Sequence, residues 1–314
     1  MPPKILVICG PTASGKTGLA VALALRHGGE VISADSMQIY RGMDIGTAKP
    51  TTAEMQGVPH HMLDVADPGE DYSVARYVET ASACVDDVLA RGKLPILAGG
   101  TGLYIDSLLS GRTFAAFTPA AGHRARLQAR AAAEGIAPLL AELEKVDPDS
   151  AARLHPADEK RIIRALEVWH ETGKTITAHN AETRSIPPRY EALTIGLDFA
   201  DRADLWSRID LRVNAMMAAG LEGEVRRLLG EGLPPGSTAM QAIGYKELAA
   251  AIAEGRPIPQ AAEEIKLRSR QYAKRQRSWF RRNQATKWIF WDRDPNFSAA
   301  LQNSTAYMEE FGLL

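Results

Sequence analysis

Residues 10–17 read Gly-Pro-Thr-Ala-Ser-Gly-Lys-Thr, and they directly follow the apolar run Ile5-Leu6-Val7-Ile8-Cys9. The spacing is G-x-x-x-x-G-K-[ST], in the strand-to-helix context in which it binds phosphate. Backbone amides and the helix N-terminus attract phosphate oxygens there, and a lysine adds charge. The alternative is a glycine-rich turn without a ligand. We predict a phosphate cradle with Thr17 as the Mg²⁺ ligand, built from Thr12, Ala13, Ser14, Gly15, Lys16 and Thr17.

The composition is that of an ordinary globular protein. The chain has 314 residues, 45% of them hydrophobic and 24% charged. A formal net charge of −1 gives no overall attraction for polyanions, so any nucleic-acid surface must be local. Only two cysteines are present, and no apolar run approaches membrane-spanning length. We expect a cytoplasmic protein, a monomer without a membrane partner.

A second strand is predicted at Glu30–Ala34, and it ends at Asp35. Ligands of open α/β sheets bind beyond the carboxyl ends of the strands, so Asp35 is expected on the same rim as the phosphate loop. Two roles compete there: a base or hydrogen-bond acceptor for an incoming nucleophile, and a second Mg²⁺ ligand beside Thr17. The third interpretation is that Asp35 is a surface carboxylate without a functional role.

A third buried strand, Leu94–Ala98, runs into Gly-Gly-Thr-Gly at residues 99–102. Glycines at the end of a strand allow a ligand to approach the backbone, and Thr101 is the polar side chain among them. ATP-hydrolysing relatives of this loop often carry an acid after such a strand. Its absence weakens the interpretation of the chain as a motor or ATPase.

The middle of the chain has helical patterns and no strand pattern. Helices are predicted at residues 124–134, 138–146 and 159–171, and strand patterns return at residues 192–197 and 288–291. The fold class expected is therefore α/β: a P-loop NTPase-like core with a parallel sheet flanked by helices, plus an inserted all-helical subdomain. We assign residues 1–114 and 190–314 to the core and residues 115–189 to the insertion.

A late helix, predicted over Ile265–Asn283, carries eight basic residues and no acid between Lys266 and Arg282. At 100° per residue its cations fall in one sector, while Ile265, Tyr272 and Trp279 lie opposite. Charge runs are often only solvated surface, but one of a single sign favours a surface for a polyanion. The sector contains Lys266, Arg270, Lys274, Arg277 and Arg281.

Taken together, these segments resemble the bacterial tRNA dimethylallyltransferase (tRNA isopentenyltransferase) family over nearly the whole chain. Its motifs are matched by GPTASGKT at residues 10–17, SADSMQIYRGMDIGTAKP at 33–50, PHHMLD at 59–64, GGTGLY at 99–104, RALEVW at 164–169, AIGYKE at 242–247 and YAKRQRSWFR at 272–281. A phosphate loop alone is unspecific, whereas this set in this order is specific.

The resemblance implies transfer of a dimethylallyl group from dimethylallyl diphosphate to N6 of the adenosine 3′-adjacent to the anticodon in tRNA, with Mg²⁺ as cofactor. It implies that Asp35 accepts the N6 proton, that Thr101 contacts the bridging oxygen, and that Arg212 holds the departing diphosphate. The anticodon stem-loop is expected to contact Ser36, Met37, Gln38, Arg124, Lys160, Arg161, Arg164, Gln241, Gly244, Tyr245 and Lys246. The basic helix adds Arg270, Lys274, Arg277 and Arg281 to this surface.

Two other activities remain open at this point. Free AMP is prenylated by related enzymes, although the basic helix and the insertion favour a larger polyanion. A P-loop kinase or ATPase is opposed by the missing acid after Leu97.

Overall fold

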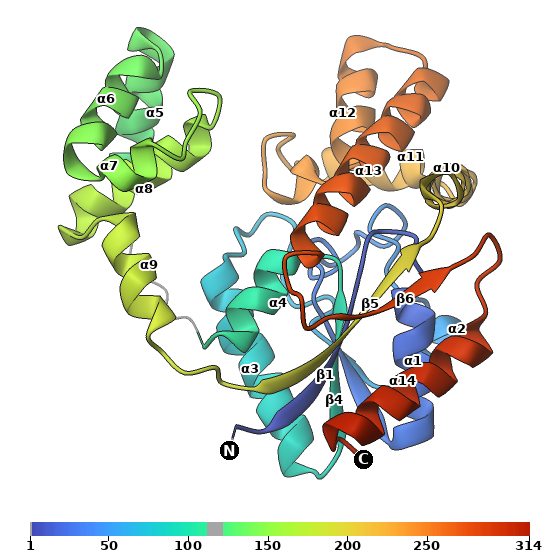
Figure 1. Ribbon diagram of the computed structural model, residues 1–314. Helices are drawn as coiled ribbons and strands as arrows, with labels where there is room; N and C mark the ends of the chain where they lie inside the picture. The colour runs from blue at the N-terminus through green and yellow to red at the C-terminus, as the bar shows by residue number, and fades with distance from the viewer. Residues whose placement is uncertain (1, 112–121) are drawn as a thin grey trace. The chain divides into compact units, whose positions relative to one another are not determined.

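The computed structural model describes residues 2–111 and 122–314 of the chain (Figure 1). Two compact units are present: a core unit of Met1–Leu109 and Arg189–Leu314, and an inserted unit of Ser110–Pro188. The first expected boundary, between residues 114 and 115, lies outside the described residues. The second falls between residues 188 and 189, one position before the expected one.

The core unit contains a six-stranded sheet in the order β3-β2-β4-β1-β5-β6, and every neighbouring pair is parallel. The strands are β1 (Lys4–Cys9), β2 (Gly29–Ser33), β3 (His60–His61), β4 (Leu94–Gly99), β5 (Glu191–Phe199) and β6 (Lys287–Trp291). Sequence analysis missed β3, because two residues carry no alternation. His61 Nε2 lies 2.7 Å from Glu30 Oε2, and His60 Nδ1 lies 2.9 Å from the Val58 carbonyl oxygen.

Helices cover both faces of the sheet because β1 is apolar on both (Figure 1). Ile5 and Val7 pack in a cluster with residues of α3 (Val74–Ala90) and α4 (Gly102–Leu109). Leu6 and Ile8 pack in a second cluster with residues of α1 (Lys16–His27) and α14 (Phe297–Phe311). A short helix, α2 (Thr52–Met55), begins with a capping box in the segment after β2. Burial of both faces fixes which loops emerge at the carboxyl edge of the sheet.

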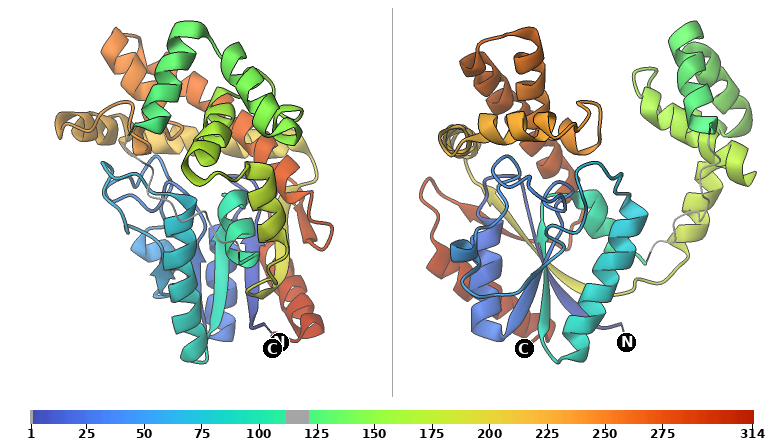
Figure 2. Two further views of the ribbon diagram at one scale, coloured as in Figure 1. Left: turned by 90° about the vertical axis from the view of Figure 1, so that its left-hand side faces the viewer. Right: turned by 180° about the vertical axis from the view of Figure 1, so that it is seen from behind.

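A second group of helices lies beyond the carboxyl ends of the strands (Figures 1 and 2). Its members are α10 (Arg202–Ala218), α11 (Leu221–Gly230), the short helix Ala239–Gln241, α12 (Tyr245–Glu254) and α13 (Ile258–Phe280). The last of these begins seven residues before the expected start and ends three residues before the expected end. Its C-terminal half is fixed to α4, since Trp279 Nε1 donates to Asp106 Oδ2 at 2.9 Å.

The inserted unit is helical throughout its described part. It consists of α5 (His123–Glu134), α6 (Ala137–Val146), α7 (Pro148–Ala151), α8 (Glu159–Thr172) and α9 (Ile176–Arg184). Leu127, Leu139, Leu143, Ile162 and Leu166 form its own apolar core. Among the residues that the structure describes, no helix is both long and apolar enough to span a membrane.

Candidate active site

The loop between β1 and α1 has the backbone of a phosphate cradle. Gly15 adopts φ 85° and Ala13 φ 63°, which turns successive amides toward the space before α1. Gly10 adopts φ 144°, and a Cβ there would collide with the Leu197 carbonyl oxygen of β5. Trp291 Nε1 donates to the Ser14 carbonyl oxygen at 2.7 Å, so β6 also holds the loop in place.

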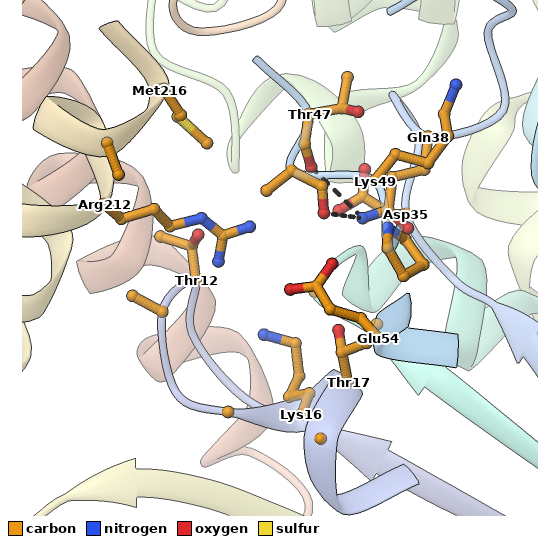
Figure 3. Close-up of a pocket in the computed structure, with 18 of the residues that line it drawn as sticks. Thr12, Lys16, Thr17, Asp35, Gln38, Thr47, Lys49, Glu54, Arg212 and Met216 are labelled. Atoms are coloured by element: carbon orange, nitrogen blue, oxygen red, sulfur yellow. Dashed lines mark hydrogen bonds between the residues drawn. The ribbon is translucent and has the colours of Figure 1, made fainter. Parts of the chain in front are cut away.

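A large cavity of about 820 Å³ opens directly above this loop (Figure 3). Lys16 and Arg212 point into it from α1 and α10, and Asp35 lines it at the end of β2. Lys16 Nζ donates to the Pro11 carbonyl oxygen at 2.6 Å. Within the described residues neither cation forms an ion pair, although both feel the charge of Asp35. The two positive charges in the cavity are therefore only partly balanced by the negative charge of Asp35.

Burial lowers the pKa of both cations. It lowers the pKa of Lys16 to about 8, helped by the charge of Arg212 and opposed by that of Asp35. It also lowers the pKa of Arg212, again against the charge of Asp35. Desolvation disfavours a charged group until an anion arrives, so this pair is suited to bind a phosphate or diphosphate.

Asp35 and Thr101 stand beside each other at the ends of β2 and β4. Asp35 Oδ1 accepts a hydrogen bond from the Met37 amide at 2.9 Å, and Thr101 Oγ1 accepts one from the Ser36 amide at 3.0 Å. No hydrogen bond to Asp35 Oδ2 occurs within the described residues. That oxygen is available to accept a proton from a bound substrate.

A second, smaller cavity of about 300 Å³ adjoins the first. Its walls are largely apolar and include Ile209, Val213, Ile243 and Ile265. The two cavities share Thr12, Asp35, Thr47, Arg212, Met216 and Tyr272. Asp35 thus lines both cavities: the larger one with Lys16 and Arg212, and the smaller one with mainly apolar side chains beside Arg212 and Arg275.

Two residues of α13 that line the large cavity, Tyr272 and Gln276, were not among the predicted site residues. Gln276 Oε1 accepts from the Thr12 amide at 2.8 Å, and its Nε2 donates to the Gly100 carbonyl oxygen at 2.9 Å. Tyr272 lies beside it, and burial, with a contribution from Asp35, raises its pKa to about 12. The available signal was a polar Gln276 on the same helical face as Ile265 and Tyr272, because buried polar groups need partners.

The segment after β2 is positioned by buried polar contacts. Gln38 accepts from Ser33 Oγ at 3.0 Å and donates to the carbonyl oxygens of Thr47 and Ala48. Met37 is partly buried against the core, and Ser36 lines the second cavity. These three residues shape the rim, and both donor hydrogens of the Gln38 amide are used within the chain.

The 241–246 stretch has mixed roles. Gln241 and Gly244 line the second cavity, and Lys246 is exposed. The Tyr245 side chain is fully buried and donates to Glu224 Oε1 at 2.5 Å, and the expected RNA contact at Tyr245 stays a prediction. Glu224 also accepts from three backbone amides at residues 44–46, so the pair fixes the cavity rim.

The four basic residues predicted to bind tRNA from the inserted unit divide into two kinds. Arg124 and Arg164 pair with the buried carboxylate of Glu167 at 2.9 and 2.6 Å. Lys160 and Arg161 are exposed, and Arg161 makes only a 3.4 Å contact with Asp158. Arg124 is exposed as well, so the difference is the partner: neither Lys160 nor Arg161 pairs with a buried carboxylate, and both remain available to a polyanion.

The basic sector of α13 is less free than its sequence predicts. Arg270 pairs with Asp210 at 2.7 Å, while Arg277 and Arg281 lie 2.7 and 3.3 Å from the fully buried Asp198. Lys266 pairs with Glu263 at 2.7 Å, leaving Lys274 without an ion pair in the described chain. The one-signed run therefore meets acids from other parts of the fold, which a helical projection cannot reveal.

The cavity fits Mg²⁺ only as a cation shared with a bound phosphate. Thr17 lines the cavity at the start of α1, and Glu54 lines it from α2. No group of three or more His, Cys, Asp or Glu side chains suited to a metal occurs among the described residues. Mg²⁺ commonly takes one protein oxygen together with phosphate oxygens and water, so this sparse donor set is sufficient.

Comparisons with known proteins agree with this geometry. The family model described as IPP transferase matches residues 38–283. A tRNA dimethylallyltransferase of Acetivibrio thermocellus is 43% identical over 310 residues, covering 99% of both chains. One of Geobacter sulfurreducens is 46% identical over 311 residues, covering 98% of this chain and 97% of that protein.

Two solved structures resemble the chain over nearly its whole length. The tRNA delta(2)-isopentenylpyrophosphate transferase of Staphylococcus epidermidis has a TM-score of 0.71 and 38% identity, covering 98% of this chain and 99% of that one. A eukaryotic dimethylallyltransferase acting on tRNA has a TM-score of 0.81 and 28% identity, covering 98% and 80%. From sequence, fold and site together, this chain belongs to the IPP transferase family.

Proposed function

We propose that this chain transfers a dimethylallyl group from dimethylallyl diphosphate to N6 of an adenosine in tRNA and releases diphosphate. The observation that carries the proposal is Asp35, which lies between a cavity lined by Lys16 and Arg212 and an adjoining apolar cavity. The names of the relatives support the same reaction.

The large cavity suits the leaving group. As the bond between C1 of the dimethylallyl group and the diphosphate oxygen breaks, negative charge collects on the diphosphate. Lys16 and Arg212, both desolvated by burial, and the loop amides meet that charge. Cations already in position stabilise such a charge without reorganising. The hydroxyl of Thr101 is assigned to the bridging oxygen.

The small cavity suits the acceptor base. An adenine there presents N6 toward Asp35, and the N6 lone pair forms the new bond to C1 as the diphosphate leaves with the electron pair of the old one. The N6 proton passes to Asp35 Oδ2. A base stacked in an RNA loop has to be extruded to enter a cavity, and apolar walls repay part of that cost. The adenosine 3′-adjacent to the anticodon is the proposed target.

Mg²⁺ is the proposed cofactor, with the Thr17 hydroxyl as its protein ligand. When bound, it supplies further positive charge to the diphosphate oxygens. Asp35 keeps the role of proton acceptor, because it lines both cavities and the Met37 amide holds its Oδ1.

The anticodon stem-loop of tRNA is the proposed macromolecular partner. Lys160 and Arg161 are exposed on the inserted unit, and Lys246 is exposed beside the small cavity. We assign the reaction to a monomer in the cytoplasm, where tRNA is modified, and the two unpaired cysteines, Cys9 and Cys84, agree with a reducing compartment.

The test is a mass measurement. The protein is incubated with Mg²⁺, dimethylallyl diphosphate and either unmodified tRNA or AMP, and each acceptor is analysed for a gain of C5H8. We expect the gain on one adenosine of tRNA and none on AMP. A gain on AMP alone would identify a nucleotide prenyltransferase, and ATP hydrolysis without prenyl product would identify a P-loop ATPase or kinase.

A further inference from the structure

Gln276 is a buried polar side chain on the inward face of α13. It is 5% exposed, and both polar atoms of its amide have partners in other parts of the fold. Its Oε1 accepts a hydrogen bond from the Thr12 amide of the phosphate loop at 2.8 Å, and its Nε2 donates to the Gly100 carbonyl oxygen at 2.9 Å. Strands β1 and β4 are last paired at Cys9 and Gly99, so Gln276 joins their two loops just past the end of the sheet.

Two glycines after β4 make room for side chains of α13. A Cβ on Gly100 would lie 2.2 Å from Gln276 Nε2, and a Cβ on Gly102 would lie 2.2 Å from Trp279 Cδ1. Cβ atoms do not approach other atoms so closely, so a larger residue at either position would displace one of these side chains. The sequence predicted that these glycines let a ligand approach the backbone. At these two positions the space is instead taken by α13, and the loop is shaped to receive Gln276.

Thr101 lies between these glycines and is tied to the same helix. Tyr272, one turn before Gln276, forms side-chain hydrogen bonds with both Thr101 and Gln276. Gln276 therefore connects the phosphate loop, the proposed cradle of the diphosphate, to the segment that carries Thr101, which is assigned to the bridging oxygen. Its amide is neutral, and its contacts go to protein groups on both sides. What this side chain sets is the distance between the two groups that hold the leaving group.

We propose that Gln276 is a positioning residue, which holds the phosphate loop at the distance from Thr101 at which both contact one diphosphate. This inference rests on the proposed function, because it takes the large cavity as the site of the diphosphate. As the bond to C1 breaks, charge develops on the bridging oxygen, and donors fixed in advance stabilise it without reorganising. A displacement of about 1 Å in such a site costs about 10²-fold in rate.

The first test replaces the amide and keeps the length of the side chain. Gln276→Met removes both hydrogen bonds, and its kcat for prenyl transfer to tRNA should fall by about 10²-fold. The KM of dimethylallyl diphosphate and the Kd of tRNA should change by less than about threefold, because the lost interaction acts in the transition state.

Trp279→Phe is the matched control on the same face of α13. It removes the 2.9 Å hydrogen bond to Asp106 Oδ2, and Trp279 is not among the residues that line the large cavity. Its kcat should stay within about threefold of the unchanged protein. An equal loss of kcat in Trp279→Phe would assign the effect to docking of the helix. A raised KM at unchanged kcat in Gln276→Met would assign it to ground-state binding. Either result would overturn the proposal.

A double-mutant cycle tests the connection to Thr101. Thr101→Val and Gln276→Met are each expected to slow transfer by about 10²-fold, and the combined variant by about 10²-fold in total and not by the product of about 10⁴-fold. Losses that multiply would show that Gln276 does not act through its spacing from Thr101. Gln276→Asn is one methylene shorter and cannot span both partners, so it takes the place of Gln276→Met in the cycle if that variant does not fold.

Hydrogen exchange gives a readout that does not depend on activity. Peptides that cover residues 10–17 should exchange faster in Gln276→Met than in Trp279→Phe or the unchanged protein, because the Thr12 amide has lost its acceptor. Equal exchange in all three proteins would overturn the proposal. The proposed function fails separately: a native protein that adds no C5H8 to tRNA refutes prenyl transfer, and faster exchange in Gln276→Met alone would still show that Gln276 holds the loop.

Discussion

The cations of the large cavity and those of the inserted unit carry the same charge in opposite surroundings. Lys16 and Arg212 line a cavity in which no carboxylate of residues 2–111 or 122–314 forms an ion pair with them. Arg124 and Arg164 converge on one carboxylate, Glu167, whose side chain is only 1% exposed. A cation paired in this way has already found its anion, whereas a desolvated cation without one is costly until a ligand binds.

The difference separates binding sites from structural ion pairs within a single chain. The pKa values of Lys16 and Arg212 are lowered mainly by burial, and no ion pair offsets that loss of hydration. Perturbed ionisation of this kind is common where a site is built for a charged substrate. Four experiments test this difference between the unpaired cations of the cavity and the paired cations of the inserted unit.

The largest effect is expected for Asp35→Asn. If Asp35 accepts the N6 proton, prenyl transfer falls by about 10³-fold at saturating substrates, within the range for a lost general base. If it serves instead as counter-charge for the cavity cations, dimethylallyl diphosphate binds more tightly and turnover changes little. Single-turnover rates and the KM of the diphosphate distinguish these outcomes. Asp44→Asn is the matched control, since Asp44 lines the same cavity but pairs with Lys49.

Arg212→Gln is expected to have the next largest effect. Loss of the unpaired guanidinium removes charge stabilisation from the departing diphosphate and lowers kcat/KM by about 10²-fold. Arg208→Gln is the control one turn earlier on α10: it lines the same cavity but is exposed. Competitive binding of inorganic diphosphate should weaken only in Arg212→Gln. Equal losses in the two variants would mean that general positive charge, not one positioned cation, holds the leaving group.

Much of this site could be predicted from local sequence. The phosphate loop follows from a spacing that only a strand, a tight turn and a helix accommodate together, and the position of Asp35 follows from the geometry of parallel strands. Both depend on residues that are neighbours in sequence. Arg212 was assigned through the family resemblance, and the structure brings it to the cavity from a helix far along the chain.

The parts that sequence did not predict depend on distant partners. The basic sector of α13 seemed uniform because Asp198 and Asp210, which pair with it, come from β5 and α10. The burial of Tyr245 is likewise decided by Glu224 of α11. Helical periodicity reports which residues share a face and gives no information about what that face meets.

The pH dependence of substrate binding tests the unpaired state of Lys16 directly. Its pKa of about 8 in the free protein means that the ammonium is charged below that pH and loses its proton above it. The KM of dimethylallyl diphosphate should therefore be insensitive to this group below about pH 8 and rise by up to about tenfold per pH unit above it. Lys16→Arg keeps its charge and should give a flat profile. A rise in both proteins would assign the titration to another group.

The smallest effects are expected in the inserted unit. Glu167→Gln keeps the shape of the side chain but removes the anion that holds Arg124 and Arg164. The free energy of unfolding should therefore fall by about 1–2 kcal/mol, less than for a fully buried ion pair, because both arginines reach solvent. If those arginines are structural, tRNA affinity changes by less than about threefold. Lys160→Gln with Arg161→Gln should do the reverse, weakening tRNA binding severalfold at unchanged stability. Chemical unfolding and anisotropy on the same four proteins, including the unchanged chain and the combined variant, separate the two roles. Tighter tRNA binding by Glu167→Gln would show that the Glu167 carboxylate competes with RNA for Arg124 and Arg164. The paired arginines would then also be RNA-binding residues, blocked only while Glu167 holds them.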